Sequence, residues 1–298
     1  MHNPFDHLAK KVGKEALEAS GPTVVQYEIF RDAQHADIRH DPDPARDAER
    51  ARLGLLGRIA AVLCLIEIYG HAPSGAEIRA CLGKHFAHRE ECERKARSQS
   101  KRRKERSLSP VPIVEPFLWL IAAVASAPML RKLDVKTAPD WPPGVYFFGD
   151  NVLRVGIVVA SELPRDRTTL LVRIMAAGPV LAEAITDLAV LHEDAHERAV
   201  AEQILIHLRH VIGKKPSRSQ EEEEFIVTMQ GSWKEARKLG RAEGEARALL
   251  TVLRGRGIAV PDAARERILT ETDPARLERW IEKASVAGSF AEVLDDPS

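Results

Sequence analysis

The sequence predicts an α/β protein in which helices flank a mixed sheet and a helical tail follows. Apolar residues at helical spacing open the chain at residues 4–19, three strand-like stretches follow, and helical and strand-like segments then alternate. The final stretch, residues 225–298, is helical by periodicity throughout. We therefore expect an α/β domain at residues 1–212, a charged linker at 213–224 and a helical C-terminal region at 225–298.

The first half of the predicted domain is a helix followed by three strands. Ser20-Gly21-Pro22 ends the first helix. Residues 23–30 and 33–40 are rich in β-branched or alternating residues, and the Asp41-Pro42-Asp43-Pro44 breaker follows them, so they predict a β-hairpin. Residues 63–69 predict the third strand.

The second half begins with a helix and returns to the sheet. Pro73-Ser74-Gly75 opens a helix that we expect to end near residue 93. Between residues 93 and 110, basic residues and serines replace apolar ones, which predicts a mobile basic loop. Later segments predict strands at 117–125, 145–148 and 153–159, and then helices over 170–210 with one interruption near His192.

Composition narrows the class of protein. The chain carries 44 basic and 44 acidic residues, so no overall field draws it to nucleic acid or to a membrane, and such binding must come from local clusters. Three cysteines do not make a disulfide framework, and no charged-then-apolar leader opens the chain. Its apolar runs are too short or too interrupted to span a bilayer. We expect a cytoplasmic protein without a membrane segment.

Two acidic residues on neighbouring predicted strands carry the clearest chemical signal. Asp37 lies in the second strand and Glu67 in the third. Because side chains alternate along a strand, Glu67 and Tyr69 emerge on one face while Ile66 and Ile68 pack behind it. Carboxylates that meet at a sheet edge are suitable ligands for Mg²⁺.

Short motifs along nearly the whole chain carry a family resemblance. They are Asn3-Pro4-Phe5-Asp6, Ala36-Asp37, Leu65-Ile66-Glu67, Glu162-Leu163-Pro164, Thr168-Thr169-Leu170-Leu171, Gly240-Arg241-Ala242-Glu243-Gly244-Glu245-Ala246, Arg256-Gly257-Ile258 and Leu277-Glu278-Arg279-Trp280. With the order helix, three strands, helix, strand, the chain resembles the PD-(D/E)XK nuclease superfamily, and especially its bacterial transposase-like, recombination-promoting branch. The resemblance implies a restriction-endonuclease-like core.

The resemblance also implies an activity and a site. It implies Mg²⁺-dependent hydrolysis of DNA phosphodiesters, with Mn²⁺ as a substitute, in which Asp37 and Glu67 bind the ion and Glu15 or Glu18 is a third acid. The motif lysine two residues after the second acid is Tyr69 here, and a neutral phenol offers only a hydrogen bond. His71 is a further candidate for moving a proton, because its ordinary pKa is about 6.5.

Three further interpretations stay open. A catalytically inactive nuclease fold that binds DNA or assembles is the first. A zinc peptidase is the second, because His192-Glu193-Asp194-Ala195-His196 has the spacing of a zincin helix; a separate helical stripe, Cys81, His85, His88 and Cys92, offers at most half of a zinc site. The third concerns partners: Lys101, Arg102, Arg103 and Lys104 are candidates for sequence-independent phosphate contacts, and the C-terminal helices for pairing two copies of the chain.

Overall fold

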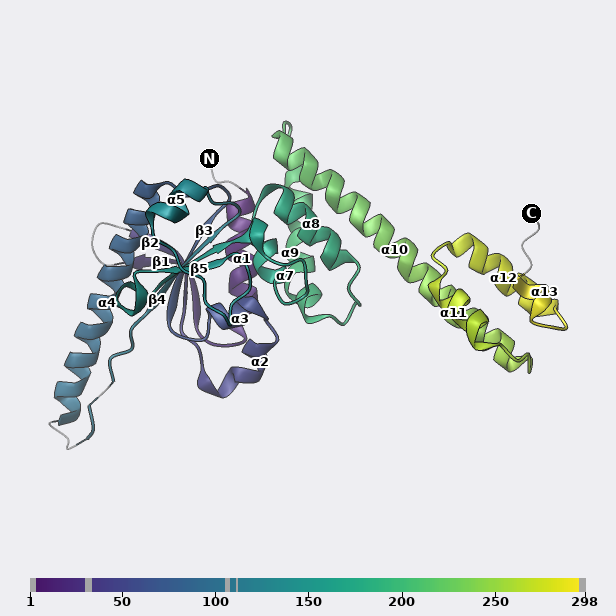
Figure 1. The fold of residues 1–298 in the computed structure, drawn as a ribbon, viewed down its shortest axis with the longest axis horizontal. Coiled ribbons are helices and arrows are strands. Elements are labelled where there is room, and N and C mark those ends of the chain that lie inside the picture. The colour runs from purple at the N-terminus through teal and green to yellow at the C-terminus, as the bar shows by residue number, and fades with distance from the viewer. Residues whose placement is uncertain (1–3, 30–33, 105–107, 111, 295–298) are drawn as a thin grey trace. The chain divides into compact units, whose positions relative to one another are not determined.

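The computed structural model describes residues 4–29, 34–104, 108–110 and 112–294 of the chain (Figure 1). The described chain divides into two compact units, Met1–Ile226 and Val227–Ser298. Unit 1 contains a six-stranded mixed sheet flanked by helices, which confirms the predicted α/β class. Asn3, in the first motif of the family resemblance, lies outside the described residues.

Helices and strands alternate along unit 1 largely in the predicted order. The strands are β1 (Thr23–Ile29), β2 (Gln34–His40), β3 (Cys64–Tyr69), β4 (Phe117–Ala122), β5 (Val145–Phe148) and β6 (Val155–Val159). The helices are α1 (Pro4–Glu18), α2 (Asp47–Ala51), α3 (Leu55–Ile59), α4 (Gly75–Lys104), α5 (Ala127–Lys132), α6 (Asp150–Leu153), α7 (Leu170–Ile174), α8 (Gly178–Ala189) and α9 (His196–Gly213), with short 3₁₀ turns at Pro44–Arg46 and Ala160–Glu162. The predicted break near His192 separates α8 from α9.

The sheet has the strand order β1-β2-β3-β4-β6-β5. The β1–β2 hairpin and the β2–β3 pair are antiparallel, whereas β3, β4 and β6 run parallel. Helix α4 is the long crossover that a parallel β3–β4 pair requires. This topology puts the acidic strands β2 and β3 next to each other.

Helices pack on both faces of the sheet (Figure 1). Cys81 and Ile78 of α4 pack with Leu65, Leu118 and other buried residues on one face. Helix α1 packs against another part of β2, where Gly13 lies so close to Ile38 that an added Cβ would come within 2.4 Å of its side chain. Both helices therefore approach the strand pair that carries the acids.

The predicted basic loop at residues 93–110 is wrong over most of its length. Helix α4 continues to Lys104, and residues 105–107 and 111 lie outside the described part of the chain. Arginine, lysine, glutamate and alanine are good helix formers, and acid–base pairs one turn apart add support. Glu91 pairs with Lys95, and Glu93 pairs with Arg97. A polar helix with such pairs along it needs no apolar face.

Unit 2 is helical and has its own core. Helix α10 (Gln220–Gly255) begins in unit 1, and unit 2 adds α11 (Asp262–Thr270), α12 (Pro274–Val286) and α13 (Ala291–Leu294). Buried residues of all four helices surround Trp280, which is 1% exposed. Pairing of these helices with a second copy of the chain stays a prediction.

The expected linker at residues 213–224 is shorter than predicted. Residues 214–219 connect α9 to α10, whereas residues 220–224 already belong to α10. The Ser219 hydroxyl accepts the Glu222 N–H, and the Glu222 carboxylate accepts the Ser219 N–H, so this acidic stretch forms a capped first turn. Within the described residues, no helix combines the length and apolar character needed to cross a membrane.

Candidate functional site

Asp37 and Glu67 lie where strands β2 and β3 separate. The ladder between these strands ends at the pair Ile38 and Ile66, and Asp37 and Glu67 occupy the next position of the same antiparallel register. Beyond this point the Asp37 carboxylate accepts the backbone N–H of Ile68, with 2.9 Å between Oδ2 and N. A side chain of β2 thus replaces a backbone partner of β3, and the two acids from separate strands come together.

Glu67 is a buried acid, and its surroundings change its protonation. The residue is 4% exposed. Burial, and next the negative charge of Asp37, raise its pKa to about 7, although Lys84 acts in the opposite direction. Two carboxylates in a poorly solvated place repel each other, and a cation near them reduces this repulsion.

Two lysines that the sequence interpretation missed contact these acids. Lys84 of α4 places Nζ 2.6 Å from Glu67 Oε1, and it also donates to the carbonyl oxygen of His35 at 3.0 Å. Lys10 of α1 places Nζ 2.9 Å from Asp37 Oδ1. Both lysine side chains are largely buried, at 15% and 11% exposure. Each helix that flanks the sheet therefore supplies one ammonium group to one acid.

The acid of α1 that joins this cluster is Asp6. Its carboxylate lies 2.8 Å from Lys10 Nζ, and although burial of Lys10 opposes protonation, Asp6 and Asp37 together raise the lysine pKa. The predicted third acid, Glu15, is exposed and lies nine residues after Asp6, roughly 180° around the helix. The structure therefore does not bring Glu15 to the cluster; the alternative, Glu18, is also exposed and lies near Lys14.

Tyr69 and His71 are engaged elsewhere than at the carboxylates. Tyr69 shares the α4 side of β3 with Glu67, and its hydroxyl lies 2.8 Å from the Cys81 sulfur. Burial and this hydrogen bond raise the pKa of the phenol. His71 is exposed, and its Nε2 lies 3.0 Å from a carboxylate oxygen of Glu77, which caps the start of α4. The contacts of both residues support the fold around the cluster.

The helix that the alternative zincin interpretation needs at residues 192–196 does not form. Helix α9 begins at His196, so His192 and Glu193 precede the helix and the two imidazoles are not one helical turn apart on it. His192 lies beside Asp194. In the stripe on α4, His85 instead bonds to the carbonyl oxygen of Leu153. The short connection between α8 and α9 thus places most of the motif in a turn.

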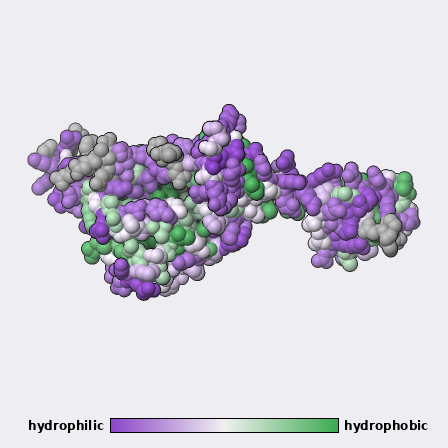
Figure 2. Space-filling view, turned by 90° about the horizontal axis from the view of Figure 1, so that it is seen from above, coloured by the Kyte–Doolittle hydropathy of each residue, from purple (hydrophilic) through white to green (hydrophobic). Residues whose placement is uncertain are grey.

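The predicted nucleic-acid contacts lie at the exposed end of α4. Lys101, Arg102, Arg103 and Lys104 form its last turn and are all exposed. Hydrophilic residues cover this end of unit 1 (Figure 2). Lys84 and Lys101 belong to the same helix and are separated along its axis by about 25 Å.

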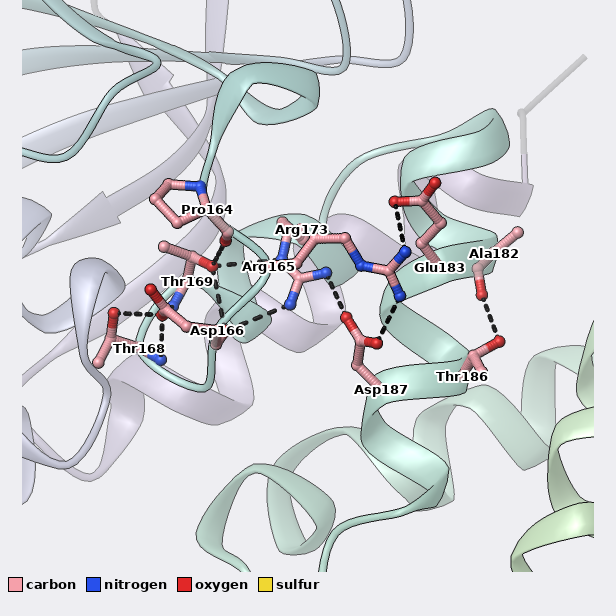
Figure 3. A network of polar contacts seen from close by, with 10 residues as sticks. All are labelled: Pro164, Arg165, Asp166, Thr168, Thr169, Arg173, Ala182, Glu183, Thr186 and Asp187. Atoms are coloured by element: carbon pink, nitrogen blue, oxygen red, sulfur yellow. Dashed lines mark hydrogen bonds and ion pairs between the residues drawn. The ribbon is translucent and has the colours of Figure 1, made fainter.

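The segment between β6 and α7, residues 160–169, forms a network of structural hydrogen bonds with Arg173 of α7 (Figure 3). The side chain of Arg173 is 3% exposed, and its guanidinium donates to Asp187, to Thr169 Oγ1 and to the Asp166 carbonyl oxygen. Thr169 Oγ1 in turn donates to the Pro164 carbonyl oxygen. These bonds fix the connection into α7 by satisfying a buried cation.

The cluster at β2 and β3 is the candidate active site. Among the described residues, no three or more histidine, cysteine, aspartate or glutamate side chains are grouped so that they could hold a metal ion. Asp37 and Glu67 are thus two carboxylates without a third ligand of these types in the part of the chain that the structure describes. No protein-family model, curated protein or solved structure matches the chain.

Proposed function

We propose that this protein is a Mg²⁺-dependent endonuclease that hydrolyses DNA phosphodiester bonds, built on a restriction-endonuclease-like core as the family resemblance implies. The observation that carries the proposal is the meeting of Asp37 and Glu67 at the point where β2 and β3 separate. The order α1, three strands, crossover helix and parallel strand supports the same core. Mn²⁺ substitutes for Mg²⁺ in this proposal.

The two acids fit a magnesium ion. Mg²⁺ is commonly held by one or two carboxylates, with water and substrate phosphate completing its octahedral shell. Burial and the nearby charge of Asp37 raise the pKa of Glu67 even though Lys84 contacts it, so a further cation would favour the ionised acid. Asp37 and Glu67 would hold the ion, which when bound lowers the pKa of a water and neutralises charge on the phosphate.

Lys84 supplies the cation that position 69 lacks. In the family motif this lysine lies on the strand, two residues after the second acid. Here Lys84 contacts Glu67 from α4 instead. Its contact with the His35 carbonyl oxygen holds the ammonium at the acid. In the proposed reaction Lys84 orients the attacking water and contacts the phosphate, while Tyr69 stays bonded to Cys81.

Plasmid nicking tests the reaction and the assignment of Lys84. We expect wild type to nick supercoiled DNA with Mg²⁺ or Mn²⁺ and not with EDTA, and Asp37→Asn and Glu67→Gln to lose this activity. Lys84→Met should lower the rate by about 100-fold or more, and Lys14→Met, on the exposed side of α1, should not. The double variant Tyr69→Lys/Lys84→Met moves the lysine from α4 to β3. If it cuts faster than Lys84→Met alone, an ammonium group near Glu67 supports cleavage from either element.

Cleavage that survives in folded Asp37→Asn protein would contradict the proposed site. Folding is checked by circular dichroism of each variant before the assay. Cleavage by wild type that persists in EDTA would contradict the metal dependence.

A catalytically inactive DNA-binding protein is the second candidate. The observation that favours it is the exposed basic end of α4, which can contact phosphates without any metal. Replacing Lys101, Arg102, Arg103 and Lys104 by glutamine should then weaken binding in EDTA. The slope of log affinity against log salt concentration should fall by about one for each phosphate that the variant no longer touches. Metal-independent binding with no nicking under any condition would select this candidate.

A further inference from the structure

A cavity of about 620 Å³ lies between α1, β1 and α9. Leu8, Ile204 and Leu208 contribute buried apolar surface to its lining. Cationic or titratable side chains surround this apolar surface: His7, Lys10, Lys11, His207 and Lys215. The volume lies within the range of about 300–1,000 Å³ that is usual for small-molecule sites. The cavity thus combines an apolar lining with groups that attract an anion.

The cavity adjoins the candidate active site. Lys10 lines it and contacts Asp37 Oδ1 through its ammonium group. Gln26 lines it as well, and Gln26 lies across from Asp37 in the β1–β2 register, between the pairs Val25–Ile38 and Tyr27–Ala36. A ligand in the cavity would therefore lie one side chain away from a proposed metal ligand.

The backbone at Gln26 departs from ordinary strand geometry. Its φ is +56°, in the left-handed region that residues other than glycine seldom adopt. Such a conformation costs on the order of 1 kcal/mol or more and is concentrated at functional sites. Gln26 both lines the cavity and lies opposite Asp37, so its strained backbone connects the cavity with the candidate active site.

The charges around the cavity favour an anion. The acid in its lining, Asp6, is paired with Lys10, and Lys215 is paired with Glu222. Among the described residues, Lys11 and His207 have no carboxylate partner, and both are exposed. These groups are available to a phosphate, whereas the buried leucine and isoleucine side chains suit the apolar ring face of a nucleobase.

We infer that this cavity binds one unpaired nucleotide of the substrate strand, next to the phosphate that is cut. The inference rests on the proposed function and names its substrate class. A base inside a duplex is stacked and paired, so it must leave the stack to enter an apolar cavity. The preferred substrate is therefore single-stranded DNA, or duplex DNA with unpaired nucleotides, rather than intact duplex.

Binding measured in EDTA tests the inference without relying on cleavage. The probes are a short fluorescein-labelled oligothymidylate and the same strand paired with oligodeoxyadenylate, followed by fluorescence anisotropy with the full chain. We expect the single strand to bind about tenfold more tightly than the duplex. Val211→Trp places an indole at the cavity from a position that is 43% exposed and should remove this preference. Val190→Trp, 59% exposed and outside the cavity, is the matched control.

A charge reversal gives a second, independent comparison. Lys11→Glu should weaken single-strand binding, whereas Lys14→Glu, on the same helix but outside the cavity lining, should have a smaller effect. Equal binding of single strand and duplex, or equal binding by Val211→Trp and Val190→Trp, would overturn the inference. If wild type nicks plasmid in that case, the proposed function still holds and only the inference about the cavity fails. If single-strand binding behaves as expected but wild type does not cut, nucleotide binding in the cavity is supported and the proposed catalysis fails.

Discussion

Wild-type unit 1 should lose stability as the pH rises through about 7, and replacing Glu67 by glutamine should remove this loss. The pKa of Glu67 is raised from 4.5 to about 7, first by burial and then by Asp37, so folding favours the protonated acid. The contribution of the Glu67 carboxyl to the unfolding free energy is therefore complete below about pH 4.5 and is lost as the pH rises through about 7. A rise of this size corresponds to about 3 kcal/mol. Glutamine has the shape of the protonated acid and does not titrate.

The measurement is urea unfolding of wild type and Glu67→Gln between about pH 5 and pH 8. Near-ultraviolet circular dichroism of the packed Trp119 and Trp141 pair follows unit 1. The unfolding free energy of wild type minus that of the variant should fall by up to about 3 kcal/mol across this range. A flat difference would refute the assignment of a raised pKa to Glu67.

Glu222 provides the control for this experiment. It is also a buried glutamate paired with a lysine, Lys215, but its pKa is lowered, chiefly by the hydrogen bond from that lysine. A lowered pKa places its titration below the range studied, because its stabilising effect is lost only as the pH falls through the folded pKa. The wild type minus Glu222→Gln difference should therefore stay constant between about pH 5 and pH 8.

Two further changes test the packing of unit 1. Asp187→Ala leaves the guanidinium of Arg173 buried without its carboxylate (Figure 3) and should lower the unfolding free energy by about 3 kcal/mol. The control is Glu183→Ala, which removes an exposed acid paired with an exposed arginine and should cost under about 1 kcal/mol. Urea denaturation of both variants measures the contrast, and equal losses would contradict it. Gly156→Ala would bring a Cβ within 2.2 Å of the Trp119 ring and should cost about 1–3 kcal/mol, with altered Trp119 fluorescence; an unchanged midpoint would contradict this packing.

The sheet and the meeting of the acids follow from local patterns. Along residues 33–40 and 63–69, alternation of side chains predicts which residues share a face of each strand. Turn residues mark where each strand ends. Chain order then makes β2 and β3 neighbours, and the structure places Asp37 and Glu67 at one register position. The register of that pair is a finding of the structure, because β2 and β3 are joined by residues 41–63, with α2 and α3 between them, and not by a tight hairpin turn.

The lysines cannot be found in the same way. Lys10 lies in α1 and its partner Asp37 in β2, and Lys84 reaches Glu67 only after α4 turns back across the sheet. A signal is nevertheless present: both lysines lie within the buried stripe of their helices, where a lysine is unusual without a partner. Glu15 has the right residue type for a third acid, but its helical phase points it away from Asp6.

The helical end of α4 departs from the sequence prediction for a related reason. A run of charged residues without an apolar face predicts a loop, but pairing of charges one turn apart supports an exposed helix. The positive residues at 101–104 therefore continue the helix that carries Lys84.

Charge balance at the candidate site has a consequence for how DNA would be held. Asp6, Asp37 and Glu67 are three carboxylates beside the two ammonium groups of Lys10 and Lys84, so the ionised cluster is net negative and repels a phosphate. The whole chain has a formal net charge of zero and supplies no compensating field. On the proposed function, affinity without metal must then come from the basic end of α4 and from the cations around the α1–α9 cavity. Variants at these two places should alter DNA binding in EDTA, whereas Asp37→Asn should strengthen it by removing a negative charge, even as it ends cleavage.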